Sequence, residues 1–227
     1  DAVLETVVEN KVLTHDAFVD AGLSEWRPKT VLCPRTFNAT LMEDLRTQLP
    51  EGGCVLKLGA RARGCGIVPV EDKVDLETVL KALLREGDTY EEFVQSLGSA
   101  DKPEVWAGIA ERAASCSGLE EQWRHWQADE QPIFLVEELC RSKPVAGPDG
   151  RPYDATLRAG FALKSDGSAQ LLGMYWKLPD ASIAEAGKSC AAQLVSHTRG
   201  GDQTASCADE DQAAVWKVLM DVVERFF

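Results

Sequence analysis

The sequence predicts an α+β fold in which helices and antiparallel strands are mixed along the chain. Two hairpin signals support this class: a glycine-rich turn between the apolar runs 54–58 and 67–70, and Asp166-Gly167 between the runs 155–163 and 171–178. Amphipathic helical patterns lie before, between and after these hairpins. Hairpins interspersed with helices favour α+β over a doubly wound parallel sheet.

The opening segment is expected to be helical. Apolar residues at helical spacing predict one helix up to Leu13 and a second short helix after Thr14, which Gly22 ends. A β-prone run at 30–33 follows, closed by a proline. Thr40-x-x-Glu43 has the form of a capping box and predicts a helix through residue 49. The run 54–58 is then the first strand of the first hairpin.

The middle of the chain is predicted to be mostly helical. Asp75 is expected to cap a helix that ends at Gly87, and residues 88–130 form a predicted helical insertion. The apolar run 133–136 is a predicted strand that leads into Glu137 and Glu138. A turn at 147–150, the second hairpin and a final helix over 209–227 complete the pattern.

Composition limits the classes of function. The chain has 227 residues, 24 of them Lys or Arg and 37 Asp or Glu, for a net charge of −13. This charge argues against nucleic acid and anionic membranes as partners, and leaves small anions possible where positive charge is concentrated. No apolar run reaches the ~20 residues of a membrane span, so a soluble protein is expected. Seven cysteines without a CxxC pair, and three scattered histidines, favour free thiols in a reducing compartment.

Positive charge is concentrated in the glycine-rich turn after residue 56. Glycines let backbone N–H groups approach a phosphate, and basic side chains supply the counter-charge, so the segment predicts a nucleotide site. The residues concerned are Lys57, Arg61, Arg63, Gly64 and Gly66. The alternative is a hairpin tip with solvated arginines. A P-loop is excluded because Cys65 follows Gly64, and a dinucleotide fingerprint is excluded because Pro69 replaces its third glycine.

Two further features bear on this site. Strand alternation places Lys57 on the face opposite Leu56 and Leu58, where a lysine needs an anion. The carboxylates of Glu137 and Glu138 follow a buried strand, where they either contact a nucleoside or begin a solvated loop.

The order of these segments resembles the ATP-grasp superfamily. The similar segments are Asn10-Lys11 with Thr14, residues 27–34, Val55-Leu-Lys57 with the turn 59–66, residues 134–139, residues 153–158, Met174-Tyr-Trp-Lys177, and residues 197–201 with the helix after them. The resemblance implies two α+β subdomains with a nucleotide site between them. Residues 1–36 would be the helical entry and lead-in strand, 37–138 the first subdomain and 139–227 the second, apparently without the terminal metal-binding strands of the family.

The resemblance also implies roles for residues. Lys57 and the glycine-rich turn would hold the phosphates of ATP, and Glu137, Glu138 and Leu139 would lie beside the adenosine. Arg158 and Lys177 would act on the acyl phosphate that forms from a carboxylate substrate. Magnesium is the implied metal, and the resemblance assigns no ligands to it in this sequence.

Two functions follow as hypotheses. The first is the ATP-binding domain of an ATP-dependent carboxylate ligase. The second is a catalytically silent ATP-grasp-like scaffold with protein partners in a larger assembly, favoured by the tryptophans of the insertion, Trp106, Trp123 and Trp126.

Overall fold

A computed structural model describes residues 9–49, 51–61, 65–71, 73–84, 91–92, 119–166, 168–185 and 203–226. Among them the chain separates into two compact units. The first, unit 1, contains residues 9–16 and the described parts of 27–140. The second, unit 2, contains 17–26, 141–185 and 203–226. Both units combine helices with antiparallel strands, so the expectation of a mixed α+β fold is confirmed.

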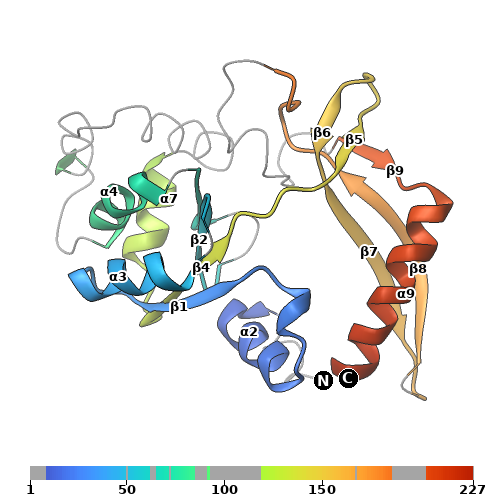
Figure 1. Cartoon of the computed structure of the whole chain (residues 1–227), viewed down its shortest axis with the longest axis horizontal. Coiled ribbons are helices and arrows are strands. Elements are labelled where there is room, and N and C mark those ends of the chain that lie inside the picture. The colour runs from blue at the N-terminus through green and yellow to red at the C-terminus, as the bar shows by residue number, and fades with distance from the viewer. Residues whose placement is uncertain are drawn as a thin grey trace. The chain divides into compact units, whose positions relative to one another are not determined.

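Unit 1 is built on a four-stranded antiparallel sheet in the order β1-β4-β2-β3. Its strands are β1 (Thr30–Pro34), β2 (Cys54–Leu58), β3 (Ile67–Val70) and β4 (Ile133–Glu138). Its helices are α3 (Ala39–Gln48), α4 (Lys73–Leu83) and α7 (Leu119–Gln127), with the start of α2 (Lys11–Asp20). Figure 1 shows α3, α4 and α7 together on one side of this sheet.

The core of unit 1 lies between these three helices and one face of the sheet. Alternate strand residues such as Cys33, Leu56 and Phe134 are buried there against helix residues such as Leu45 and Leu80. The ring of Trp126 is also fully buried in this core and meets that of Phe134 edge-on, with centroids 5.6 Å apart. Trp126 therefore packs the core and does not face a partner, whereas Trp106 lies outside the described residues.

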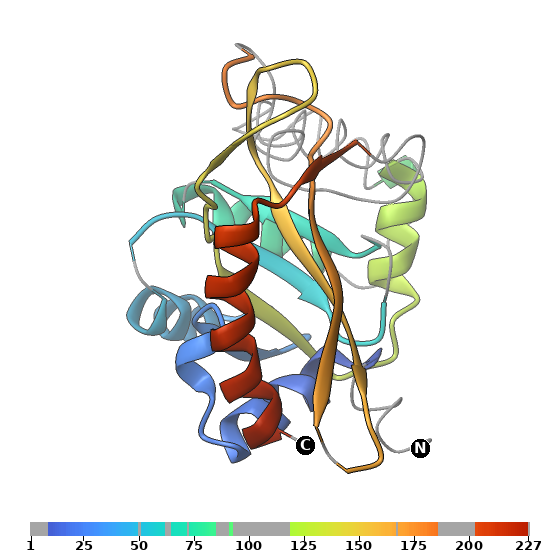
Figure 2. The same cartoon turned by 90° about the vertical axis from the view of Figure 1, so that its right-hand side faces the viewer.

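Unit 2 contains a long antiparallel hairpin of β7 (Thr156–Leu163) and β8 (Ala169–Lys177), which β9 (Thr204–Ser206) extends beside β8. The short strands β5 (Pro144–Ala146) and β6 (Pro152–Asp154) pair across the predicted turn. The 3-10 helix η1 (Ser24–Trp26) and helix α9 (Asp209–Phe226) complete it. Figure 2 shows α9 running alongside the β7–β8 hairpin, where Val215 and Trp216 pack against a core that includes Met174.

The helix starts differ from those predicted. Glu9 is helical, Asn10 is not, and α2 begins at Lys11 and continues through Thr14, so the break between helices lies at Asn10 and not at Thr14. The Oδ1 of Asn10 accepts hydrogen bonds from the backbone N–H groups of Val12 (2.9 Å) and Leu13 (3.4 Å) and caps the start of α2. Helix α4 begins at residue 73, so Asp75 lies inside it and is not its cap. The predicted insertion 88–130 is described only in part, and α7 is its main described element.

Helix α3 is capped by Asn38, not by the predicted capping box at Thr40. The extended backbone of Asn38 lets its Oδ1 accept a hydrogen bond from the N–H of Leu41 at 2.8 Å. Asn38→Ala is therefore expected to lower the free energy of unfolding by about 1 kcal/mol, the usual value of a lost N-cap. Urea denaturation should show this loss. Thr40→Ala is the matched control, and an equal or larger loss in that variant would contradict the assignment of the cap.

Candidate functional site

The candidate site lies on the face of the unit 1 sheet opposite helices α3, α4 and α7. In the register of the sheet, Glu137 of β4 lies opposite Thr30 of β1 and Val55 of β2, whereas Lys57 lies opposite Leu135. Lys57 and Glu137 are therefore diagonal neighbours on one face of paired strands, close enough for long side chains to meet. The alternation that predicted Lys57 on the face opposite Leu56 and Leu58 is confirmed.

Glu137 is the buried anion of this face. Its side chain is 5% exposed, its Oε2 accepts a hydrogen bond from the Nζ of Lys57, and its Oε1 lies 3.4 Å from the Nη2 of Arg27. The side chains of Lys57 and Arg27 are 25% and 16% exposed. Glu137 thus lies within strand β4 as an ion-pair partner, and it does not begin a solvated loop.

Lys11 brings a third cation to the same region. Its Nζ donates to the carbonyl oxygen of Leu58 (3.1 Å) and to that of Arg61, and its backbone N–H donates to the carbonyl of Gly59 (3.0 Å). These bonds join the start of α2 to the turn after β2. Burial lowers the pKa of Lys11, and the positive charge of Lys57 lowers it further. We name Lys11, Arg27, Lys57 and Glu137 the Glu137 cluster.

A second ion-pair group lies at the turn after β2. Arg61 donates from Nη2 to the carbonyl of Ala128 (3.3 Å), and its Nε lies 3.9 Å from Asp129. Asp129 also pairs with Arg35 at 3.2 Å. Arg61 is therefore engaged with residues 128–129, and a role at phosphates would require it to release or share Asp129.

The glycine-rich turn is described at its two ends, whereas Arg63 and Gly64 lie outside the described residues. Gly66 has φ of +69°, and a Cβ placed on it would lie 2.5 Å from the Cδ1 of Leu58. Both the positive φ and the close approach require glycine, so this residue fixes where the chain enters β3. Its structural role accounts for Gly66 without a ligand.

Glu138 is the last residue of β4, and Leu139 follows it. The Oε2 of Glu138 lies 3.4 Å from the backbone N–H of Lys29, which donates to it. The N–H of Leu139 donates to the carbonyl of Gly53 at 3.0 Å. Only its carbonyl and its half-buried side chain are then available to a nucleoside.

Arg158 and Lys177 belong to unit 2. In the β7–β8 register, Arg158 pairs with Tyr175 and Lys177 pairs with Thr156. Both basic residues therefore lie on one face of the hairpin, and Met174 and Trp176 lie on the other face, towards the core. Arg158 is exposed, whereas Lys177 is only 4% exposed. Their catalytic roles stay predictions.

The described residues do not fit a magnesium site. No group of three or more His, Cys, Asp or Glu side chains within those ranges lies close enough to hold a metal ion, so no ligand is assigned. Within the same ranges, no helix is long and apolar enough to cross a membrane.

Sequence reasoning found Lys57 and Glu137 but missed Lys11 and Arg27 as parts of one cluster. Both were noted only as segments of the helical entry and the lead-in strand. Arg35 and Asp129 were missed as well. The available signal was indirect: a buried strand ending in Glu137 requires nearby cations, but nothing in the sequence says which of the chain's 24 basic residues supply them.

Comparisons with known proteins give matches among solved structures. No family model matches the chain, and no curated protein does. The crystal structure of D-alanine–D-alanine ligase from Helicobacter pylori, an ATP-grasp enzyme, is similar with a TM-score of 0.37 and 12% sequence identity. The match covers 96% of this chain and 48% of that ligase, so the chain spans about half the ligase's length.

Removing the carboxylate of Glu137 should destabilise unit 1. Glu137→Ala leaves Lys57 and Arg27 partly buried without their anion, and breaking such a pair costs about 3 to 5 kcal/mol. The paired replacement Lys57→Met with Glu137→Leu is expected to cost clearly less, because neither charge of that pair remains. Urea denaturation measures both. A double variant as unstable as Glu137→Ala would show that the Lys57–Glu137 pair is not the cause and would assign the loss to Arg27, which loses the same carboxylate in both variants.

The thiol of Cys33 is excluded as a nucleophile at neutral pH. Burial raises its pKa to about 12, above the value of 9.0 for a free thiol. The unfolded chain then releases this proton first, so the free energy of unfolding should fall as the pH rises from about 9 towards 12. Denaturation across this range should give a shallower fall for Cys33→Ala than for the parent chain. A pH-independent difference between the two would contradict the shifted pKa.

Proposed function

We propose that unit 1 binds the phosphates of ATP at the Glu137 cluster, and that the chain is the ATP-binding domain of an ATP-dependent carboxylate ligase. The observation that carries the binding site is the gathering of three cations on one sheet face: Arg27 and Lys57 pair with Glu137, and Lys11 lies close enough for the charge of Lys57 to lower its pKa after burial. In a chain with a net charge of −13, such a gathering of positive charge favours an anionic ligand.

The cluster is suited to phosphate because its cations are held in place before the ligand arrives. Glu137 fixes the ammonium of Lys57, and the carbonyls of Leu58 and Arg61 fix that of Lys11. Burial is the main cause of the lowered pKa of Lys11, and repulsion between Lys11 and Lys57 lowers it further. An anion placed beside both ammonium groups relieves this repulsion. Less entropy is lost on binding when the donors are already ordered.

The adenosine would lie beside β4, with Glu138 as a hydrogen-bond acceptor and Leu139 as an apolar contact. This part of the proposal is supported by the ATP-grasp resemblance of residues 134–139. The carbonyl of Leu139 is its available backbone group, because its N–H already bonds Gly53.

The proposed chemistry is acyl activation. A carboxylate oxygen of the substrate attacks the γ-phosphorus of ATP, the bond to the β-phosphate oxygen breaks, and ADP leaves. An amine or another nucleophile then attacks the acyl carbon and displaces phosphate. Arg158 and Lys177 are proposed to stabilise the negative charge of the acyl phosphate. The described residues assign no ligand to magnesium, and the roles given above are those of the chain's own side chains.

Lys57→Ala is expected to weaken ATP binding by about 1.5 to 3 kcal/mol, the range of a lost charge-assisted hydrogen bond. Titration calorimetry measures the affinity, at a temperature where both proteins are folded. Lys164→Ala removes the same charge from an exposed position of unit 2 and serves as the control.

Equal affinity of the parent chain and Lys57→Ala would remove Lys57 from the site. Absence of binding to the parent chain at millimolar ATP would overturn the nucleotide proposal as a whole. The scaffold hypothesis would then be the one to pursue.

A further inference from the structure

A groove runs along the outer edge of the unit 1 sheet. Strand β1 is the last strand of the sheet, so its side away from β4 has no neighbouring strand among the described residues. Helix α3 forms the other wall, and the groove has a volume of about 220 Å³. It is lined by all residues of β1 together with Asn38, Thr40, Leu41, Asp44 and Gln48, and we name it the edge groove.

The register shows which backbone groups face this groove. Glu138 N–H donates to the carbonyl of Lys29, and Arg35 N–H donates to the carbonyl of Pro132. Odd-numbered residues of β1 therefore bond to β4, and even-numbered residues point their backbone groups outwards. Thr30 and Leu32 each present an N–H and a carbonyl to the groove. Pro34 presents a carbonyl only, because proline has no N–H.

These outward groups form the template that an added strand needs. No other strand in the described ranges pairs with them, and unpaired edge groups of this kind commonly accept an extended peptide. A groove between an edge strand and a helix also supplies side-chain contacts beside the backbone ladder. Here Val31 and Cys33, whose side chains face the helices, lie on the strand side, and Leu41 lies on the helix side.

Charge indicates what kind of peptide fits. Asp44 is the only formally charged residue that lines the edge groove, and no described cation pairs with its carboxylate. The whole chain is also strongly acidic. A second copy of the chain would bring another net charge of −13 and be repelled, whereas a basic segment would be attracted.

We propose that the edge groove binds an extended, basic segment of a partner protein, which adds to β1 as a fifth strand of the sheet. The segment's backbone pairs with Thr30 and Leu32, and a Lys or Arg side chain reaches Asp44. This inference concerns a different part of unit 1 from the Glu137 cluster and does not depend on ATP binding.

The probe is a fluorescently labelled, amidated peptide of about eight residues in which threonine and valine alternate and two central positions are arginine. Fluorescence anisotropy with the full chain measures its affinity. It should bind at least tenfold more tightly than the same peptide with glutamate in place of arginine. Two further peptides carry N-methyl groups on alternate backbone nitrogens, one on the odd-numbered and one on the even-numbered residues. One of them should bind at least tenfold more weakly than the unmodified peptide, because only every second N–H group of an added strand pairs with β1.

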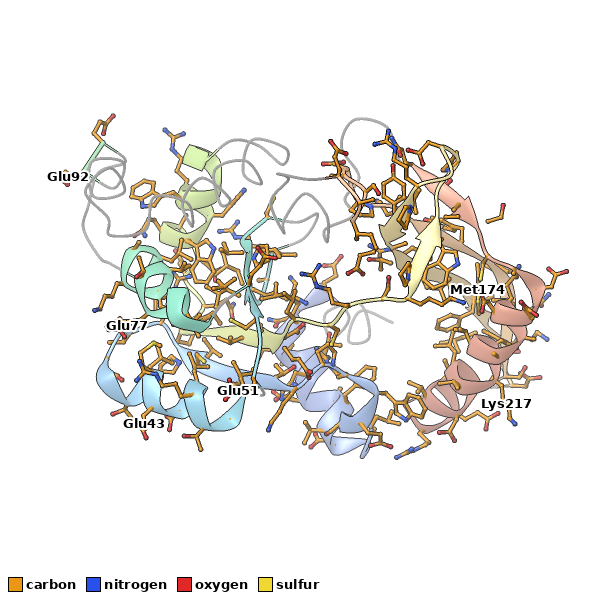
Figure 3. All side chains as sticks on the ribbon, turned by 45° about the horizontal axis from the view of Figure 1, so that its top comes forward. Glu43, Glu51, Glu77, Glu92, Met174 and Lys217 are labelled. Atoms are coloured by element: carbon orange, nitrogen blue, oxygen red, sulfur yellow. The ribbon has the colours of Figure 1, made fainter. Side chains whose placement is uncertain are left out.

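Asp44→Asn tests the charge contact. It should weaken binding of the arginine peptide about three- to fivefold, the scale of an exposed ion pair, and leave the glutamate peptide no weaker. Glu43→Gln is the matched control: Glu43 is on the same helix but does not line the groove, and Figure 3 shows it on the outer side of α3. This control should bind like the parent chain.

Three results would overturn the proposal. The first is that the arginine peptide shows no saturable binding at millimolar concentration. The second is that both N-methylated forms bind as tightly as the unmodified peptide. The third is that Asp44→Asn and Glu43→Gln lose the same affinity for the arginine peptide. Light scattering of the chain alone provides a further check, because a stable dimer that Leu32→Pro disrupts would assign the edge to a second copy instead.

Discussion

The open face of the unit 1 sheet depends on the carboxylate of Glu137. A carboxylate that is 5% exposed must be paired, and the pairing draws in Lys57 from β2 and Arg27 from the segment before β1. Lys11 then joins through the carbonyls of the turn after β2. One buried anion thus pairs with two cations, and carbonyl oxygens of the turn hold a third nearby, so that the segment before β1 and the start of α2 are both fixed to the sheet.

This arrangement explains which part of the fold the sequence could predict. The alternating strands and the face occupied by Lys57 follow from the sequence pattern, because a sheet covered on one side by helices buries every second residue, as in β1, β2 and β3. Helix starts were less predictable. Asn38 caps α3 although Thr40-x-x-Glu43 has the more familiar pattern, since backbone conformation before the helix decides which side chain can bend back. Asn10 likewise caps α2 at a start that helical spacing alone did not predict.

The site was predictable only in part, for a related reason. Lys57 and Glu137 occupy regular strands, whose register follows from their pattern, whereas Lys11, Arg27 and Asp129 come from a helix start and from loops. Their positions depend on tertiary packing that no local spacing encodes. Trp126 shows the opposite case: an insertion that suggested a partner surface instead contributes a fully buried ring to the core.

The same sheet offers three separate chemical environments, because a sheet has two faces and each of its end strands has one free edge. The helices cover the first face, the Glu137 cluster occupies the second, and the edge groove uses the backbone of β1. Thr30 connects the last two, since it lies opposite Glu137 and turns its own backbone groups outwards. Its side chain and backbone point in different directions, however, so a strand added at β1 leaves the cations of the cluster in place. Anion binding and strand addition can therefore be altered independently by substitution.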